Sequence, residues 1–152
     1  MPRSTFVYVS YIRTTPEKLW SALTDQEFMK QYWFGCHCES HWKAGSSWKL
    51  IRDGQVLDAG EILEAEAPRR MVIRWQNQKP ELKAEGESRC TIELEPAGTA
   101  VKLSVTHSIE RQPSKLIDAV SGGWPKIISN LKSLLEGGTI ALMEAYPAKS
   151  AA

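Results

Sequence analysis

The spacing of apolar residues changes after Pro113 from a strand pattern to a helix pattern, and this change constrains the fold of the 152-residue sequence more than any other feature. From residue 35 to 108, short segments with alternating apolar and polar residues are separated by turn signals such as "KAGSS", "RDGQ" and "EPAGT". This pattern is typical of antiparallel strands that bury one face. After Pro113 the apolar residues recur at helical spacing as far as Leu135. The sequence therefore predicts six strands followed by a helical region whose wide apolar face packs on the sheet.

The amino-terminal segments predict one further strand and two short helices. "FVYVSYIRT" is rich in β-branched and aromatic residues, which favour a strand. "TTPEKLWSALTD" and "QEFMKQYW" have helical spacing, with Thr14 and Asp25 as expected N-caps. We expect an α+β fold in which the two short helices follow the first strand.

The carboxy-terminal region contains "SGGWP", which predicts a break between a short helix and a long one. Gly122 and Gly123 weaken a helix interior, and Pro125 suits a helix start. "EGG" then predicts the end of the long helix. We expect a single domain over residues 1–138 and a tail over residues 139–152, in which "IALMEAY" adds a helical turn.

Composition excludes several classes of function. Nineteen basic and 18 acidic residues offer no basic stripe for nucleic acid, so we expect no such partner. The amino-terminal segment alternates in polarity and lacks the apolar core of a signal peptide, and no segment is long and apolar enough to span a membrane. Three cysteines, an odd count, are expected to be reduced thiols. These features predict a cytoplasmic protein.

Four segments in this order resemble the START-like (SRPBCC, Bet v 1-like) superfamily and, within it, the branch named after the heat shock protein 90 ATPase activator homologue. The resemblance covers about residues 5 to 138. The segments are "TTPEKLWSALTDQEFMKQYW", "DAGEILEAEAPRRMVIRW", "GTAVKLSVTHS" and "GGWPKIISNLKSLLEGG".

The resemblance implies a helix-grip fold, in which a seven-stranded antiparallel sheet wraps around the long carboxy-terminal helix. It also implies a hydrophobic cavity that takes a lipid, sterol, polyketide or other apolar molecule in many relatives. The eukaryotic activator has an additional amino-terminal domain that grips the chaperone. Because we find no such segment here, we expect a chaperone partner to be doubtful.

In such a fold, the strands and the long helix bring a set of mostly apolar side chains around one cavity, where they form a small-molecule site. We expect the cavity residues to be Trp33, Phe34, Cys36, Cys38, Trp48, Leu50, Ile62, Trp75, Leu103, His107, Trp124, Ile127, Ile128 and Leu131.

His107 is the expected polar anchor, because it shares the strand phase of apolar residues that face inward. It is either a general acid or base of an enzyme or a histidine whose hydrogen bonds are satisfied within the core. The strand phases of Asp58 and Arg74 leave open whether either charge faces inward.

The segment "WFGCHCESHW", residues 33 to 42, allows two interpretations. Cys36, Cys38 and His41 are possible zinc ligands, with His37, Glu39 or Cys90 as the fourth. On an extended strand, however, His41 points away from both cysteines. We therefore expect no metal site, with the two cysteines as pocket wall and the histidines on the solvent side.

The sequence predicts a protein that binds an apolar or amphipathic small molecule, such as a lipid-like, polyketide-like or aromatic compound. No nucleophile elbow, phosphate-binding loop or paired carboxylate motif is present, so we assign no catalytic residue and no cofactor. Two alternatives stay open. One is a cyclase-like or hydrolase-like enzyme that uses His107, and the other is a module that modulates a chaperone ATPase. The apolar "IALMEAY" face allows a homodimer.

Overall fold

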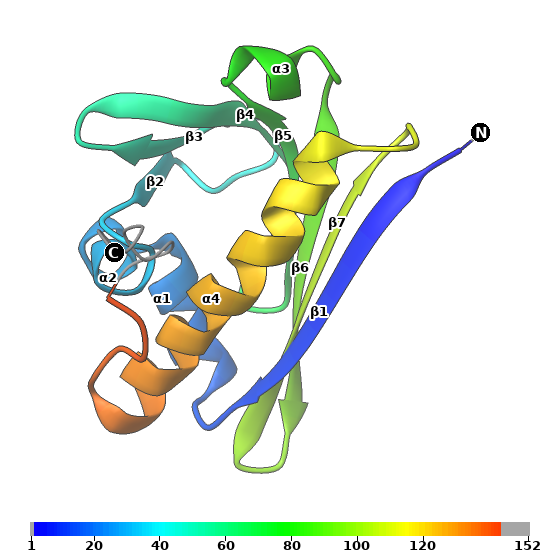
Figure 1. Cartoon of the computed structure of the whole chain (residues 1–152). Helices are drawn as coiled ribbons and strands as arrows, with labels where there is room; N and C mark the ends of the chain where they lie inside the picture. The colour runs from blue at the N-terminus through cyan, green and yellow to red at the C-terminus, as the bar shows by residue number, and fades with distance from the viewer. Residues whose placement is uncertain (1, 144–152) are drawn as a thin grey trace, which may run out of the picture.

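The computed structural model describes residues 2–143 and confirms the α+β helix-grip fold (Figure 1). A seven-stranded antiparallel sheet has the strand order β1-β7-β6-β5-β4-β3-β2. The elements in chain order are β1 (Ser4–Ile12), α1 (Pro16–Thr24), α2 (Gln26–Tyr32), β2 (His37–Ser40), β3 (Ser47–Arg52), β4 (Gln55–Glu66), β5 (Arg70–Asn77), α3 (Pro80–Lys83), β6 (Ser88–Ala97), β7 (Ala100–Ile109) and α4 (Lys115–Gly137).

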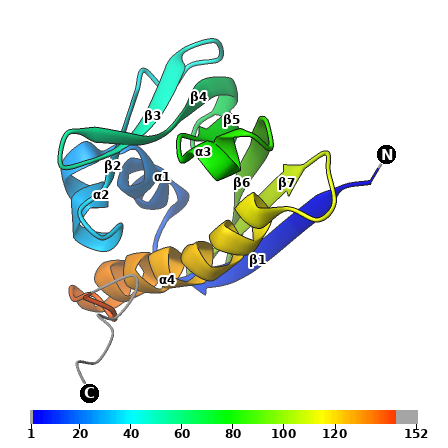
Figure 2. The ribbon, with the colours of Figure 1, turned by 45° about the horizontal axis from the view of Figure 1, so that its top comes forward.

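The helices α4, α1 and α2 form one layer, which packs its apolar faces against one face of the sheet. α4 lies on one face of the sheet and runs alongside β1, while the strands from β5 to β3 curve away from it (Figure 2). α1 and α2 fill the space between β2 and the second half of α4 (Figure 1). The core between the helices and the sheet is apolar and contains side chains from all seven strands and from α1, α2 and α4. None of the described helices is long and apolar enough to span a membrane.

Local sequence signals explain the start of each short helix. The Thr15 side chain accepts a hydrogen bond from the backbone N–H of Lys18, so the cap of α1 is Thr15 and the expectation of Thr14 was wrong by one residue. Pro16 then occupies the first helical position, where its missing N–H is not needed. The Asp25 side chain caps α2 as expected. The short helix α3, within a segment predicted as a turn, was not expected.

α4 is one continuous helix of 23 residues, so the predicted break at "SGGWP" was wrong. Gly122, Gly123 and Pro125 are all accommodated inside it. Each glycine is unfavourable by roughly 1 kcal/mol in a helix, but packing of an amphipathic face contributes more to helix stability than local propensity does. Trp124 and Ile127 lie in the buried stripe on both sides of Pro125, and their burial holds the segment helical.

Hydrogen bonds of two polar side chains hold α4 in place, those of Glu85 outside the helix and those of Asn130 within its second half. At its start, the Glu85 carboxylate accepts hydrogen bonds from the Ser114 hydroxyl (2.7 Å) and the backbone N–H of Lys115 (2.8 Å). Near its end, the buried Asn130 side chain exchanges two hydrogen bonds with the backbone of Leu142, at 2.8 and 2.7 Å. The helix therefore has a defined position over the sheet.

The tail was expected to begin after residue 138 and to add a helical turn at "IALMEAY". α4 ends at Gly137, and Gly138 adopts the left-handed conformation that commonly ends helices, with φ of 78°. Residues 140–143 are not helical, so this part of the expected turn is absent. The remaining residues of the predicted turn, 144–146, lie outside the described part of the chain.

Candidate functional site

Two tryptophans meet across the inner face of the sheet because a glycine lies between them. Trp48 on β3 and Trp75 on β5 both pair with Gly60 on β4. Their ring centroids are 4.3 Å apart. Only a glycine fits this position, since a Cβ atom on Gly60 would lie 1.6 Å from the carbonyl oxygen of Arg74. The "DAGE" segment thus brings two large rings together at the centre of the molecule.

α4 and the end of α2 add two more indole rings to this cluster. The centroid of Trp124 on α4 lies 5.8 Å from that of Trp75 and 5.5 Å from that of Trp33. Trp33 directly follows α2 as its C-cap residue. Such tilted and edge-to-face arrangements are favourable for aromatic pairs. The aromatic cluster therefore joins the sheet to α4 and α2.

A cavity of about 180 Å³ lies between the first half of α4 and the strands β3 to β5. Small residues at positions 119 and 123, one turn apart on α4, leave room for it. Its lining residues are Trp33, Leu50, Asp58, Trp75, Asn77, Leu116, Ala119, Val120, Gly123, Trp124 and Ile127. A second, enclosed space of about 20 Å³ lies deeper, among the tryptophan rings.

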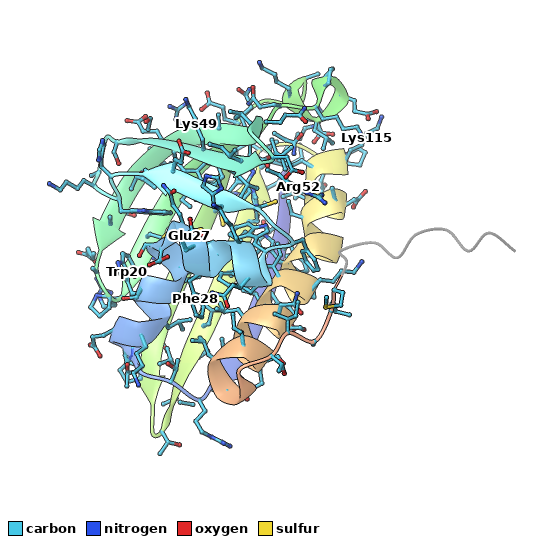
Figure 3. The ribbon with its side chains drawn as sticks, turned by 90° about the vertical axis from the view of Figure 1, so that its left-hand side faces the viewer. Trp20, Glu27, Phe28, Lys49, Arg52 and Lys115 are labelled. Carbon is cyan, nitrogen blue, oxygen red and sulfur yellow. The ribbon has the colours of Figure 1, made fainter. Side chains whose placement is uncertain are left out.

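Positive side chains flank the elements that form the cavity. Figure 3 shows Arg52, at the end of β3, and Lys115, at the start of α4, on the same side of the molecule. Arg52 follows the lining residue Leu50 by two positions, and Lys115 directly precedes the lining residue Leu116. Both side chains belong to exposed residues.

Asp58 is the one charged residue among those that line the cavity. It is 5% exposed, and its Oδ1 atom accepts hydrogen bonds from the indole N–H of Trp75 (2.8 Å) and from Nδ2 of Asn77 (2.8 Å). Burial raises the pKa of this carboxyl from 3.8 to about 6, although the two hydrogen bonds oppose the rise. No cationic side chain of the described residues forms an ion pair with it. The cavity thus holds a buried acid that lacks a counter-ion.

His107 lies behind the aromatic cluster and is fully buried. Its Nδ1 accepts a hydrogen bond from the indole N–H of Trp124 (3.2 Å), so its proton must lie on Nε2. Nε2 lies 2.8 Å from the Ser88 hydroxyl, which donates to the carbonyl oxygen of Trp75. Burial lowers the pKa of His107 to about 4. Both ring nitrogens are satisfied within the core, as in the structural alternative considered for this histidine.

The expected cavity residues separate into three groups. The cavity is lined by five of them, Trp33, Leu50, Trp75, Trp124 and Ile127. Three more border only the deeper enclosed space, namely Cys38, Trp48 and Ile128. The other six, Phe34, Cys36, Ile62, Leu103, His107 and Leu131, line neither space and pack in or against the core. Large side chains fill most of the interior, which leaves the cavity at one end of the aromatic cluster.

The "WFGCHCESHW" segment follows strand parity. Cys36 and Cys38 are buried, whereas Glu39 and His41 are exposed and the His37 ring faces Glu39 (3.2 Å). Burial raises the pKa of the Cys36 thiol to about 11, which keeps it protonated at neutral pH. Within residues 2–143, no three histidine, cysteine or acidic side chains come together as metal ligands.

Six lining residues were not identified as site residues from the sequence: Asp58, Asn77, Leu116, Ala119, Val120 and Gly123. The orientation of Asp58 had been left open. It shares the inner face with Gly60 and the core residue Ile62, so its phase in β4 was a usable signal. Arg74, the other uncertain charge, forms ion pairs with Glu61 and Glu87 away from the cavity.

Comparisons with solved structures agree with this architecture. Protein MLL2253 from Mesorhizobium loti superposes with a TM-score of 0.74 at 26% identity, over 87% of this chain and 96% of that protein. A structure described as the Aha1 dimer from Colwellia psychrerythraea has a TM-score of 0.72 at 19% identity, over 89% and 98% of the two chains. PFC0360w from Plasmodium falciparum, described as an HSP90 activator, has a TM-score of 0.70 at 21% identity, over 86% and 95%.

The sequence itself gives a family assignment that agrees with these structures. No curated protein matches the chain. The model of the family described as Activator of Hsp90 ATPase homolog 1-like protein matches residues 13–136, which span α1 through α4 and include every residue that lines the cavity. The chain, with its START-like helix-grip fold, therefore belongs to the Activator of Hsp90 ATPase homolog 1-like family.

Proposed function

We propose that this protein binds a small apolar or amphipathic molecule in the cavity between α4 and β3–β5. The observation that carries the proposal is an apolar cavity with a single buried carboxylate at its wall. Small-molecule sites typically combine hydrophobic walls with a few well-placed polar groups. Asp58, rather than His107, serves as the polar anchor, because both ring nitrogens of His107 are already engaged with Ser88 and Trp124.

The size of the cavity limits the ligand. Sites for drug-sized molecules are commonly about 300–1,000 Å³, whereas this cavity is about 180 Å³. The ligand is therefore either a compact molecule or a larger one that inserts only its head group. The hydrogen bonds between Glu85 and the start of α4 and from Asn130 to the Tyr32 carbonyl support a site that is largely formed before binding.

The buried Asp58 carboxylate lowers the stability of the fold, which indicates that it is retained for a function. A buried, unpaired carboxylate is unfavourable, and a well-packed apolar residue would stabilise the fold more. Structures tolerate such groups mainly where they bind or react. The buried Asp58 carboxylate therefore supports the cavity, rather than the surrounding core, as the functional site.

Two adjacent glycines of α4 provide a matched test. A Cβ atom added at Gly122 or at Gly123 would meet no atom within 4 Å, so a side chain can start at either position without a clash. Gly123 lines the cavity and Gly122 does not. We expect native mass spectrometry and NMR screening with small apolar compounds to detect ligands that shift the indole N–H signals of Trp75 and Trp124. Gly123→Leu should abolish these shifts and Gly122→Leu should keep them. Equal loss in both variants, or no ligand at all, would refute the proposal.

The family description and the Plasmodium falciparum HSP90 activator support a second candidate function, which is modulation of a chaperone ATPase. An assay of Hsp90 ATPase activity with increasing amounts of this protein tests it directly. Stimulation that Asp58→Asn leaves unchanged would point to a surface interaction independent of the cavity. No stimulation at saturating protein would exclude this function.

A further inference from the structure

We propose that the cavity recognises the ammonium group of an amine, held between the Asp58 carboxylate and the indole rings of Trp33, Trp75 and Trp124. This inference rests on the proposed small-molecule function and specifies the chemical class of the ligand. It follows from the charge of the cavity wall, from the arrangement of the aromatic rings and from the number of polar groups present.

The Asp58 carboxylate has an oxygen atom without a hydrogen-bond donor among the described residues. Its Oδ1 atom accepts both hydrogen bonds, from Trp75 and Asn77, whereas Oδ2 accepts none from the described residues. Buried carboxylates are normally paired with a cation because the isolated charge is strongly disfavoured in an apolar environment. Every ion pair of the described residues involves other carboxylates. A ligand ammonium would supply the missing positive charge. It would either donate a hydrogen bond to Oδ2 or lie close enough for electrostatic attraction.

Three indole rings surround the same cavity. Trp33, Trp75 and Trp124 all line the cavity together with Asp58. Tryptophan gives the strongest cation–π attraction of the aromatic residues, and clusters of aromatic rings are a recurrent device for binding ammonium groups. The hydrogen bond from Trp75 to Asp58 holds one ring directly beside the carboxylate. The same small volume thus presents a formal negative charge and three indole rings.

The lining residues also argue against other charged ligands. A hard metal cation needs six or more oxygen ligands, and Asp58 and Asn77 are the only lining residues with a polar side chain apart from the indole N–H groups. An anionic head group would face an unpaired carboxylate at close range. Arg52 and Lys115 lie near the same end of the molecule, but both are exposed, so solvent and salt screen their repulsion of a cationic ligand.

Three phenethyl compounds of similar size distinguish these possibilities. Phenethylamine is a cation at pH 7.5, phenethyl alcohol is its neutral counterpart, and phenylpropionate is the anionic one. Calorimetric titration measures the affinity of each for the wild-type protein, for Asp58→Asn and for the control Asp53→Asn. Asp53 is a suitable control because its carboxylate is 94% exposed at the β3–β4 turn.

We expect phenethylamine to bind wild-type protein at least about tenfold more tightly than phenethyl alcohol, the scale of one well-formed charge interaction. Asp58→Asn should remove this preference, and Asp53→Asn should retain it. The amine should also shift the NMR signal of the Trp75 indole N–H, which contacts the carboxylate. Equal or stronger binding of the alcohol or of phenylpropionate would overturn the ammonium inference while supporting a cavity ligand. The proposed function itself would be overturned if none of the three compounds bound and if the ligand screen also found no compound whose binding Gly123→Leu abolishes.

Discussion

Replacing Asp58 by asparagine should stabilise the folded protein at neutral and alkaline pH. Asparagine has the same shape, and its Oδ1 atom still accepts the hydrogen bonds that Trp75 and Asn77 donate to Asp58. It removes the buried charge, whose cost is visible in the pKa of the carboxyl, raised from 3.8 to about 6 by burial. A substitution that improves stability at a site of function is the expected sign of a residue retained for binding.

The magnitude follows from the pKa. One pKa unit corresponds to about 1.4 kcal/mol, so ionising Asp58 in the folded protein lowers the free energy of unfolding by about 3 kcal/mol. A group whose folded pKa is raised is harmless below its unfolded pKa, and the loss of stability grows as the pH rises through the folded value. The advantage of Asp58→Asn should therefore be about 0.5 kcal/mol at pH 4, about 1.5 kcal/mol at pH 5 and about 3 kcal/mol at pH 8.

Urea unfolding followed by tryptophan fluorescence at these three pH values measures the difference directly. Asp53→Asn again serves as the control, and its stability should follow that of the wild type at every pH. Comparison of variants at each pH cancels the opposite contribution of His107, whose lowered pKa makes the fold less stable as the pH falls from 6.5 towards 4. A variant that is less stable than wild type at pH 8, or an advantage that does not change with pH, would refute the buried-charge argument.

Three further predictions test the parts of the fold that shape the site. Gly60→Ala should lower the free energy of unfolding by about 3 kcal/mol or more, because its Cβ would overlap the Arg74 carbonyl. Gly122→Ala should raise it by about 0.5–1 kcal/mol, because alanine favours a helix interior more than glycine does. Denaturant titration of both variants measures this contrast. Glu85→Gln should cost about 1 kcal/mol by weakening the cap of α4, and faster hydrogen exchange confined to the first turn of α4 should accompany it. His107 should stay neutral with its proton on Nε2 down to about pH 5, and nitrogen chemical shifts that report protonation near its usual 6.5 would contradict the assigned network.

Periodicity predicted the strands well because most of them bury one face. The predicted turns "KAGSS" and "RDGQ" flank β3, and "EPAGT" spans the end of β6 and the turn into β7. The long-range packing of Trp124 was invisible to the same reasoning. Local propensity therefore predicted a break at "SGGWP", where burial of the apolar stripe keeps α4 continuous.

The interior was predicted less well than the fold, because strand phase tells which side chains face inward but not how tightly they fill the space. His107 faces inward as predicted, yet the tryptophan rings separate it from the cavity. Conversely, Ala119 and Gly123 line the cavity because their side chains are too small to fill it. A small residue in a sequence does not by itself indicate that a cavity lies beside it. Cavity position depends on such differences in side-chain volume across several elements.

The β3–β4 pairing beside Asp58 illustrates a second limit, which is the effect of a β-bulge on strand phase. Leu50 pairs with Asp58, but the next pair is Ile51 with Val56, so Leu57 has no partner on β3. Leu50 and Ile51 are consequently both buried, although strict alternation would expose one of them. Bulges re-aim side chains and are common beside functional sites. The bulge directly precedes Asp58, the one buried carboxylate of residues 2–143, and shifts the phase of Val56 relative to it. No alternating pattern in the sequence could have located this bulge.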